Sequence, residues 1–442
     1  MSNNHSLAKH INQAKSELDK NPFKAKRYGK ISSVVGTVVE CTGLEASIGE
    51  SYCIHTTTGK KVTAEVVGLK NGQTFLIPYD RVDGIKSGCL VESLGQTLSI
   101  PVGIELLGRV VNADAEPIDK LGPVLCKQQR PVHNTPPAPL ERKQIDEVMY
   151  TGIRAIDTLN TLGVGQRLGL FAGSGVGKSV LLGMIAKHSD ADVNVIALVG
   201  ERGREVQEFI TESLGEEGLA RSVVVAVTSD MAAMSRIKGA FTATAIAEYF
   251  RGQGKNVLLM MDSVTRVAMA QREIGLASGE PPTTKGYTPS VFAILPKLLE
   301  RAGKTKSGSI TALYTVLVDN DDMNEPIADA VRSILDGHIV LSRRLAHRNH
   351  YPAIDILQSV SRVMPKIISD EQRAVAMKAR ELLATYREAE DLINIGAYVK
   401  GSNPKIDEAV KKNPGLESFL IQDLHEADFS ENLWESLKKI IQ

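Results

Sequence analysis

The sequence is poor in cysteine, and its few cysteines stand far apart. The chain of 442 residues contains only Cys41, Cys53, Cys89 and Cys126, and no two of them form a C-x-x-C pair. This spacing argues against a zinc site and against the disulfide framework of a small secreted protein. We therefore expect reduced cysteines with a structural role.

Net charge and long apolar runs are also absent. Lys plus Arg equals Asp plus Glu at 52 residues each, so no global field favours nucleic acid or a membrane surface. No segment has the apolar length of a membrane span, and residues 1–10 lack the apolar core of a signal peptide. These absences predict a cytoplasmic protein, and the length suits two or three domains.

A short leader, residues 1–24, precedes the first domain. Leu7, Ile11, Ala14 and Leu18 recur there at helical spacing between charged residues. This narrow apolar stripe favours an amphipathic docking helix and, about equally, a frayed tail or a helix packed on its own body.

Residues 25–100 are predicted to form a small β-barrel. Short β-type runs at 31–39, 62–67 and 73–77 are punctuated by glycine, as in a barrel of short strands. The proline-rich stretch 117–139 breaks the pattern and predicts a linker.

Residues 101–365 alternate strand and helix patterns. Four continuous apolar runs are typical of strands buried on both faces, and they lie at 193–198, 223–227, 257–261 and 310–318. With helical stretches such as 232–249 between them, they predict a mostly parallel sheet flanked by helices.

Residues 366–442 are predicted to form a helical C-terminal domain. Residues 374–389 and 406–410 are its clearest helical segments, and the chain ends in an amphipathic run that contains Trp434, Leu437 and Ile440.

A glycine-rich loop between a strand pattern and a helix pattern predicts a P-loop. Gly173, Gly175 and Gly177 allow backbone N–H groups to converge on an oxyanion at a helix N-terminus. Lys178 would reach the β and γ phosphates and Ser179 would ligate Mg²⁺; a ligand-free turn is disfavoured by roughly ten to one. The predicted nucleotide-binding residues of the loop are Gly173, Ser174, Gly175, Val176, Gly177, Lys178, Ser179 and Val180.

Hydrolysis needs carboxylates in addition to a phosphate cradle. Asp262 ends the apolar run 257–261, where a carboxylate can hold Mg²⁺ beside the loop; strands also end in Asp as a turn residue, but the P-loop favours the metal role. Glu201 follows another apolar run and is a candidate for orienting the attacking water. From spacing alone, an ordinary acid at the entry to a helix is equally favoured, and Glu205 would serve there as well.

Three blocks of sequence closely resemble the rotary ATP synthase α/β family: 200–205 (GERGRE), 261–266 (MDSVTR) and 352–362 (PAIDILQSVSR). The sequences of three other blocks are similar to the type III protein export ATPases, and among them to the flagellum-specific branch. These blocks are 173–184, 279–292 and 336–344. The resemblance runs from about residue 25 to the C-terminus. It implies an α/β fold with an N-terminal β-barrel, a central RecA-like P-loop domain and a helical C-terminal domain.

The resemblance also implies roles for individual residues. Glu201 would be the catalytic carboxylate and Arg202 would help to fix the site. Arg362 would be an arginine finger that reaches the γ-phosphate of a neighbouring subunit, and Tyr351 would stack on adenine, with a buried core tyrosine as the alternative. Since one chain carries both Glu201 and Arg362, the resemblance implies a homohexamer with a site at every interface.

The implied activity is hydrolysis of ATP with Mg²⁺, coupled to chaperone release and to delivery of export substrates. The implied partners are a dimeric negative regulator at the leader helix, a coiled-coil stalk protein, export chaperone–substrate complexes and a membrane export gate, without nucleic acid. Segment 386–398 looks like the C-terminal domain on which stalk and chaperones dock. The implied location is the cytoplasmic face of the inner-membrane export apparatus.

Other functions stay open at this point. An ATPase of a virulence injectisome shares nearly the same chemistry. A hexameric RNA translocase would need a basic, aromatic-studded barrel, whereas residues 28–100 mix acids and bases and contain few aromatics. A binding module without activity is the least favoured class, because both carboxylates, the loop and the finger are present.

Overall fold

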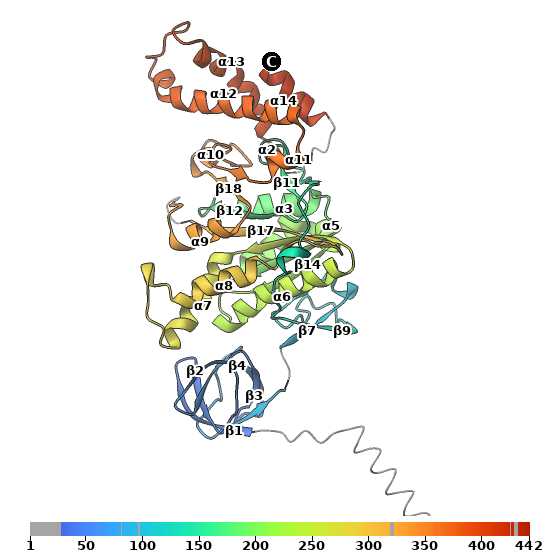
Figure 1. Cartoon of the computed structure of the whole chain (residues 1–442), viewed down its shortest axis with the longest axis vertical. Coiled ribbons are helices and arrows are strands. Elements are labelled where there is room, and N and C mark those ends of the chain that lie inside the picture. Colours follow the sequence, from blue (N-terminus) through green and yellow to red (C-terminus); the bar gives the residue numbers. More distant parts are fainter. Residues whose placement is uncertain (1–27, 81, 96–97, 319–321, 425, 428–431) are drawn as a thin grey trace, which may run out of the picture. The chain divides into compact units, whose positions relative to one another are not determined.

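The computed structural model describes residues 28–80, 82–95, 98–318, 322–424, 426–427 and 432–442 (Figure 1). The predicted leader helix lies outside these residues. The chain forms two compact units, which part after Gln96; residues 79–81 belong with the larger, C-terminal unit.

The smaller unit is a closed antiparallel barrel of six strands in the order β1-β2-β5-β4-β3-β6. Its strands are β1 (Tyr28–Val35), β2 (Val38–Thr42), β3 (Ser51–His55), β4 (Lys61–Lys70), β5 (Gln73–Pro78) and β6 (Leu90–Ser93). Alternate residues such as Val62, Ala64 and Val66 point into the core. The predicted barrel is confirmed. The run 31–39 is split into two strands, because Gly36 turns the chain with a φ of 59°.

The larger unit is built on a nine-stranded sheet in the order β19-β18-β12-β17-β15-β13-β14-β8, with β16 beside β17. The pairs from β18 to β8 are parallel, while β16 and β19 are antiparallel. The four predicted apolar runs are the buried strands β13 (Val193–Val199), β14 (Ser222–Val227), β15 (Asn256–Asp262) and β17 (Ser309–Leu317). The other strands are β8 (Val110–Val111), β12 (Arg167–Ala172), β16 (Gly303–Lys304), β18 (Gly337–Leu341) and β19 (Val360–Ser361).

Helices cover both faces of this sheet (Figure 1). Helices α6, α7 and α8 lie together on one side, and α3 and α5 lie on the other. Their bounds are α3 (Lys178–His188), α4 (Gly203–Glu208), the π-helix η3 (Phe209–Leu214), α5 (Gly215–Ala220), α6 (Ala233–Gly252), α7 (Val264–Ala277), α8 (Pro289–Leu299) and α9 (Pro326–Ile334). The predicted helix at 232–249 is α6. The mostly parallel, helix-flanked sheet is confirmed.

The proline-rich stretch 117–139 is not the linker that we predicted, because it belongs to the larger unit. It contains β9 (Gln128–Pro131), which pairs with β7 (Ser99–Val102). Proline is tolerated in such a short, two-stranded edge, so its presence did not mark a boundary. Further short elements are η1 (Ile104–Leu106), η2 (Pro139–Glu141), β10 (Val148–Met149), β11 (Leu162–Gly163), α2 (Arg154–Leu159) and η4 (Thr284–Gly286).

The chain ends in packed helices, which confirms the predicted helical C-terminus. They are α12 (Asp370–Asn394), α13 (Pro404–Leu420) and α14 (Leu433–Ile441), and the short helices α10 (Arg343–His347) and α11 (Met364–Ile367) precede them. The buried stripe of α14 is Leu433, Leu437 and Ile441, while Trp434 and Ile440 pack at its margin. Among the described residues, no helix combines the length and the apolar character that a membrane span requires.

Candidate active site

The loop between β12 and α3 has the form of a phosphate cradle. Gly175 and Gly177 adopt positive φ angles of 78° and 87°, which a residue with a side chain rarely adopts. Val176 is buried and anchors the loop, whereas Ser174, Ser179 and Val180 are exposed at its open side. The loop therefore presents backbone N–H groups and the N-terminus of α3 towards solvent.

Three of the predicted site residues lie together beside this loop. Asp262 ends β15, which pairs with β13, and Glu201 follows the end of β13. The Lys178 ammonium forms an ion pair with Asp262, and its Nζ lies 4.0 Å from Oε1 of Glu201. Parallel strands place their carboxyl ends at one edge of the sheet, and this brings both carboxylates to the loop.

Glu201 is in an environment that disfavours its charge. Burial and the neighbouring charge of Asp262 raise its pKa to about 7, although Lys178 opposes the shift. Its Oε1 is buried and accepts no hydrogen bond. The helix-entry role that spacing alone left open falls to Glu205, whose Oε2 accepts a hydrogen bond from the Arg202 backbone N–H at 3.3 Å.

A cavity of about 550 Å³ adjoins the loop, a volume typical of small-molecule sites. Tyr351 lines it and is 41% exposed, so the alternative of a buried core tyrosine is wrong. A Cβ placed on Gly177 would lie 3.4 Å from Tyr351 Cε1, which shows how closely the ring covers the loop. The cavity is lined by Gly175, Gly177, Val180, Leu181, Met184, Asn349, Tyr351, Pro352, Ile421, Gln422, Asp423 and Leu424.

Two predicted residues are not brought to Lys178. The Arg202 side chain is 80% exposed and lies 3.7 Å from Glu205. Arg362 is exposed and donates from Nη1 to the Leu335 carbonyl at 3.2 Å. Leu335 precedes β18, which runs parallel to β12, so Arg362 lies at the end of the sheet opposite to the P-loop. The six residues of β12 separate the two ends by roughly 20 Å.

Comparison with known protein families matches the barrel, the nucleotide-binding domain and the C-terminal helices separately. The nucleotide-binding domain of the ATP synthase alpha/beta family matches residues 152–361, and its beta-barrel domain matches 31–95. The T3SS EscN ATPase C-terminal domain matches residues 368–439. A flagellum-specific ATP synthase of Bacillus subtilis is 58% identical over 91% of this chain and 92% of its own.

The chain belongs to the ATP synthase α/β family. Its relatives in this family are named flagellum-specific ATP synthases and type 3 secretion system ATPases. A type 3 secretion system ATPase of Xanthomonas euvesicatoria is 50% identical over 94% of both chains. The assembled ATPase EscN of enteropathogenic E. coli superimposes with a TM-score of 0.88 at 47% identity, covering 94% of this chain and 100% of its own. The same ATPase solved with its central stalk EscO gives 0.86.

Several residues of this family member's site were missed by the sequence analysis. Thr315 donates from its hydroxyl to Asp262 Oδ1 at 2.8 Å and fixes that carboxylate. Arg266 lies against Gly200 and its charge acts on Glu201. Gln422 donates its backbone N–H to the Tyr351 carbonyl at 2.9 Å. A threonine in a strand and a glutamine after a helix carry no motif, so no pattern could have identified them.

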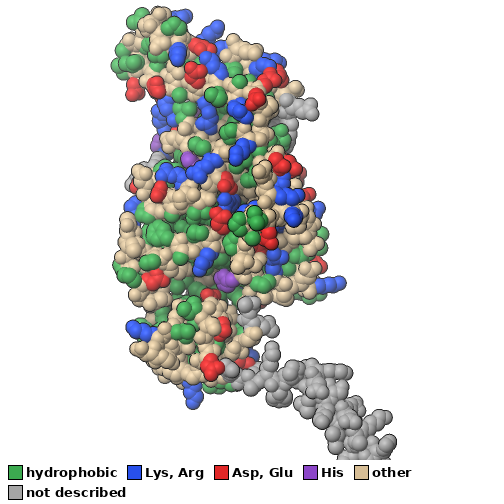
Figure 2. Space-filling model, viewed as in Figure 1, with side chains coloured by type: hydrophobic (Ala, Val, Ile, Leu, Met, Phe, Trp, Pro, Cys, Tyr) green, Lys and Arg blue, Asp and Glu red, His purple; other side chains and the backbone are tan. Residues whose placement is uncertain are grey.

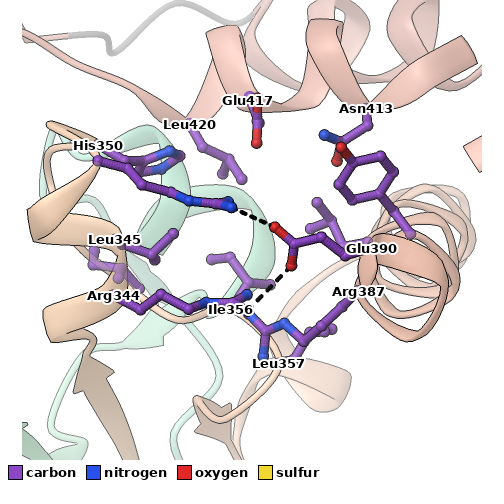
Figure 3. Close-up of a pocket in the computed structure, with 14 residues that line it drawn as sticks. Arg344, Leu345, His350, Ile356, Leu357, Arg387, Glu390, Asn413, Glu417 and Leu420 are labelled. Carbon is purple, nitrogen blue, oxygen red and sulfur yellow. Dashed lines mark hydrogen bonds and ion pairs between the residues drawn. The ribbon is translucent and has the colours of Figure 1, made fainter. Parts of the chain in front are cut away.

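The C-terminal helices are joined to the segment of the nucleotide domain that precedes Tyr351 in the chain. Figure 3 shows Glu390 of α12 reaching two arginines of the α10 region, with His350 and Glu417 nearby. Its carboxylate accepts from Arg348 at 2.6 Å and from Arg344 at 3.1 Å. These contacts tie α12 to the segment that carries the cavity's aromatic side chain.

Proposed function

We propose that this ATPase hydrolyses MgATP at the interfaces of a homohexamer and serves the flagellar type III export apparatus. The observation that carries the proposal is the placement of Lys178, Asp262 and Glu201 at one end of the sheet and of Arg362 at the other. One subunit thus offers a phosphate cradle with its carboxylates on one side and a guanidinium on the other. A ring of identical subunits would bring these two ends together at every interface.

The residues at the loop suit a magnesium ion. A hydroxyl on Ser179 and a carboxylate on Asp262 are the hard oxygen ligands that Mg²⁺ prefers, and the unsatisfied oxygen of Glu201 leaves an acceptor for water beside them. When bound, the ion would neutralise charge on the phosphates. In the proposed mechanism the loop amides and Lys178 hold the β and γ phosphates, and the cavity beside Tyr351 takes the adenine.

Glu201 would accept a hydrogen bond from the attacking water and hold it in line with the γ-phosphorus. The new bond forms from water oxygen to phosphorus while the bond to the bridging oxygen breaks, and ADP leaves with that electron pair. Arg362 of the neighbour would offer paired N–H donors to the charge that spreads over the transferring phosphoryl group. The proposed role of Arg202 at the site is supported only by the family resemblance.

The first experiment follows ATPase rate against protein concentration while light scattering reports the mass. We expect the specific rate to rise steeply as a six-subunit species appears. Arg362→Ala should lose hydrolysis in the ring yet keep ATP binding, and Glu201→Gln should do the same. Mixing the two variants should restore part of the activity, since some interfaces then combine an intact carboxylate with an intact finger. A fully active monomer would contradict the shared site.

The place of this activity in the cell is proposed from the relatives. Flagellum-specific relatives at up to 58% identity support chaperone release and substrate delivery to a membrane export gate, at the cytoplasmic face of the inner membrane. The EscN complex with its stalk EscO supports a coiled-coil stalk partner. A dimeric regulator at residues 1–24 and chaperone complexes at the C-terminal helices complete the proposal.

An injectisome ATPase is the second candidate, because a type 3 secretion system ATPase is 50% identical. The chain should be expressed in a flagellated bacterium that lacks its own export ATPase. Restored filaments would support the flagellar role. Restored secretion by an injectisome in a matching strain, without filaments, would favour the second candidate.

A further inference from the structure

We infer that Gln166, Arg167 and Asp336 are positioning residues for Arg362, so that they set activity at the neighbouring subunit's site. The inference rests on the proposed role of Arg362 as a finger acting across the interface. It concerns the end of the sheet opposite to the P-loop, where β12 begins.

The backbone and the side chain of Arg362 are both held by one turn. Its backbone N–H donates to the Asp336 carbonyl at 3.1 Å, and its Nη1 donates to the Leu335 carbonyl at 3.2 Å. These two residues precede β18, whose partner β19 leads directly into Arg362. The direction in which the guanidinium leaves the surface therefore depends on how rigidly the Leu335–Asp336 turn is fixed.

The Asp336 carboxylate fixes that turn to the start of β12. Its Oδ2 accepts from the Arg167 backbone N–H at 3.1 Å and from Nε at 3.0 Å, and its Oδ1 accepts from Nη2 at 3.0 Å. The Asp336 backbone N–H donates in return to the Arg167 carbonyl at 2.9 Å. Paired Arg–carboxylate hydrogen bonds of this kind are both strong and directional. Arg167 is itself mostly buried, with 14% of its side chain exposed.

Gln166 joins the turn to the strand that carries Arg362. It is fully buried, and its Nε2 donates to the Asp336 carbonyl at 3.2 Å and to Ser361 Oγ at 3.1 Å. Its Oε1 accepts from the Gly163 backbone N–H at 2.9 Å. One amide thus clamps the residue before Arg362 and the residue that accepts its N–H. A buried amide with these partners satisfied leaves little freedom for either segment.

Variants at this end of the sheet test the inference. Asp336→Asn keeps the shape of the side chain and weakens its hold on Arg167; Gln166→Met keeps the volume and removes the clamp. In rings of either variant we expect kcat to fall by about tenfold or more, since small misplacements of a catalytic group are costly. Binding of a fluorescent ATP analogue should change by less than about twofold, because the cradle is untouched.

Asp146→Asn is the matched control, because it removes another aspartate from an ion pair at the same end of the sheet. Asp146 pairs with Lys304 at 2.5 Å, and Lys304 lies in β16 beside the start of β17. Within the described residues, the ion pairs of Lys304 are with Asp146 and Glu147 and do not involve the Leu335–Asp336 turn, so kcat of this variant should match that of the unchanged chain.

The strand β12 also leads into the P-loop of the same subunit, so a variant at its start could damage that subunit's own site. Mixed rings distinguish such damage from a misplaced Arg362. Combined in equal amounts with Glu201→Gln, an Asp336→Asn subunit keeps its own carboxylate and receives an intact finger, so roughly a quarter of interfaces should regain activity. Glu201→Gln is mixed separately with Arg362→Ala, with Asp336→Asn and with Gln166→Met. If the mixture with Arg362→Ala regains activity but neither of the other two mixtures does, the inference is wrong, whereas the proposed role of Arg362 at the neighbouring site is supported. If Arg362→Ala is not rescued either, the proposed function itself fails. Unchanged kcat in both variants would also overturn the inference.

Discussion

Glu201 lies where burial and a second carboxylate both oppose its ionisation. Its pKa of about 7 is well above that of an ordinary glutamate, so near neutral pH the side chain is divided between the acid and the carboxylate. Only the carboxylate can accept a hydrogen bond from water with both oxygens. The proposed water-orienting role therefore makes activity sensitive to pH in the neutral range.

We expect kcat/KM for ATP to rise with pH through a limb centred near 7, because this parameter reports groups of the free enzyme. The sign for stability is the opposite. A carboxyl with a raised pKa binds its proton more tightly in the folded state, so its penalty appears as pH rises from about 4.5 through 7. Glu201→Gln should lose hydrolysis and be more stable than the unchanged chain above pH 7, as measured by urea unfolding. A flat rate profile between pH 6 and 8 would contradict this assignment.

Thr315 orients Asp262 and offers a second test of the site. Thr315→Val removes the hydroxyl that donates to Oδ1 of Asp262, and we expect a Mg²⁺ requirement raised by roughly tenfold. Thr311→Val is the matched control on the same strand. Its hydroxyl accepts from the Gly165 N–H at 2.8 Å, far from the loop. Each variant should lose about 1 to 2 kcal/mol of stability, whereas the Mg²⁺ titration should move only for Thr315→Val.

What sequence reasoning could predict at this scale follows from how local the signal is. Lys178 and Asp262 follow from a loop motif and from an acid at a strand end, and the structure brings them into contact. Thr315 acts across two paired strands, 53 residues away from Asp262, and a threonine in an apolar run has no distinguishing pattern. Gln422 likewise reaches Tyr351 only through the fold. The Arg202 side chain points to solvent and lies near Glu205, away from Lys178.

At the scale of elements, the continuous apolar runs were reliable because parallel strands covered on both faces must be apolar throughout. The amphipathic pattern at the C-terminus was a less reliable guide to which side chains are buried. The buried stripe of α14 follows Leu433, Leu437 and Ile441, since α12 and α13 receive that face, and Trp434 packs only at the edge. The linker was misplaced for a related reason, although the predicted end of the barrel at residue 100 lies close to the point after Gln96 where the units part. Proline reports on local backbone geometry, whereas a linker is defined by which residues pack together.

The joint between α12 and α10 gives the prediction that belongs to this scale. Glu390→Gln should destabilise the protein by about 1 kcal/mol, a modest value because both arginines are half exposed. Burial raises the pKa of Glu390, but the hydrogen bond from Arg348 and the charges of both arginines outweigh it and leave the pKa below its usual value. Its contribution is therefore present at neutral pH and lost as pH falls through that lowered pKa.

Glu388→Gln is the matched control for this joint, two residues earlier on α12 and exposed. Urea unfolding at pH 7 should separate the two variants, and the difference should shrink as the pH falls below the usual pKa of a glutamate. Hydrogen exchange in α12 and α13 should quicken only in Glu390→Gln. Equal stability of both variants at pH 7 would show that the ion pairs do not hold the helices.

At the scale of the whole molecule, the two ends of one sheet have different proposed tasks. The carboxyl ends of the strands carry the phosphate loop and its carboxylates, and the opposite end carries Arg362 on a short antiparallel addition, β19. A strand of six residues, β12, is too long for the finger to reach its own loop. An arrangement with both ends in one chain makes each subunit a donor to one site and an acceptor at another, which is why we expect activity to depend on assembly.

The barrel unit decides between protein export and RNA translocation, because a translocase of the ring type would bind RNA there. Its charges are mixed, and Figure 2 shows both signs on the visible face of this unit. In residues 28–78 and 82–95 the acids are Glu40, Glu45, Glu50, Glu65, Asp83 and Glu92, and the bases are Lys30, Lys60, Lys61, Lys70 and Lys86. No excess of positive charge is available to follow a phosphate backbone.

Aromatic platforms are equally scarce on the barrel. Among the described residues of the barrel, Tyr52 is buried, Phe75 is partly buried and only Tyr28 is largely exposed, whereas single-strand binding relies on several exposed rings on which bases stack. We therefore expect polyuridylate to leave the ATPase rate of the assembled protein unchanged within about twofold at low salt, where electrostatic binding is strongest. A ring-forming RNA translocase measured in the same buffer is the positive control. Stimulation that disappears on raising the salt concentration would mean that RNA binds, and the export function would then have to be reconsidered.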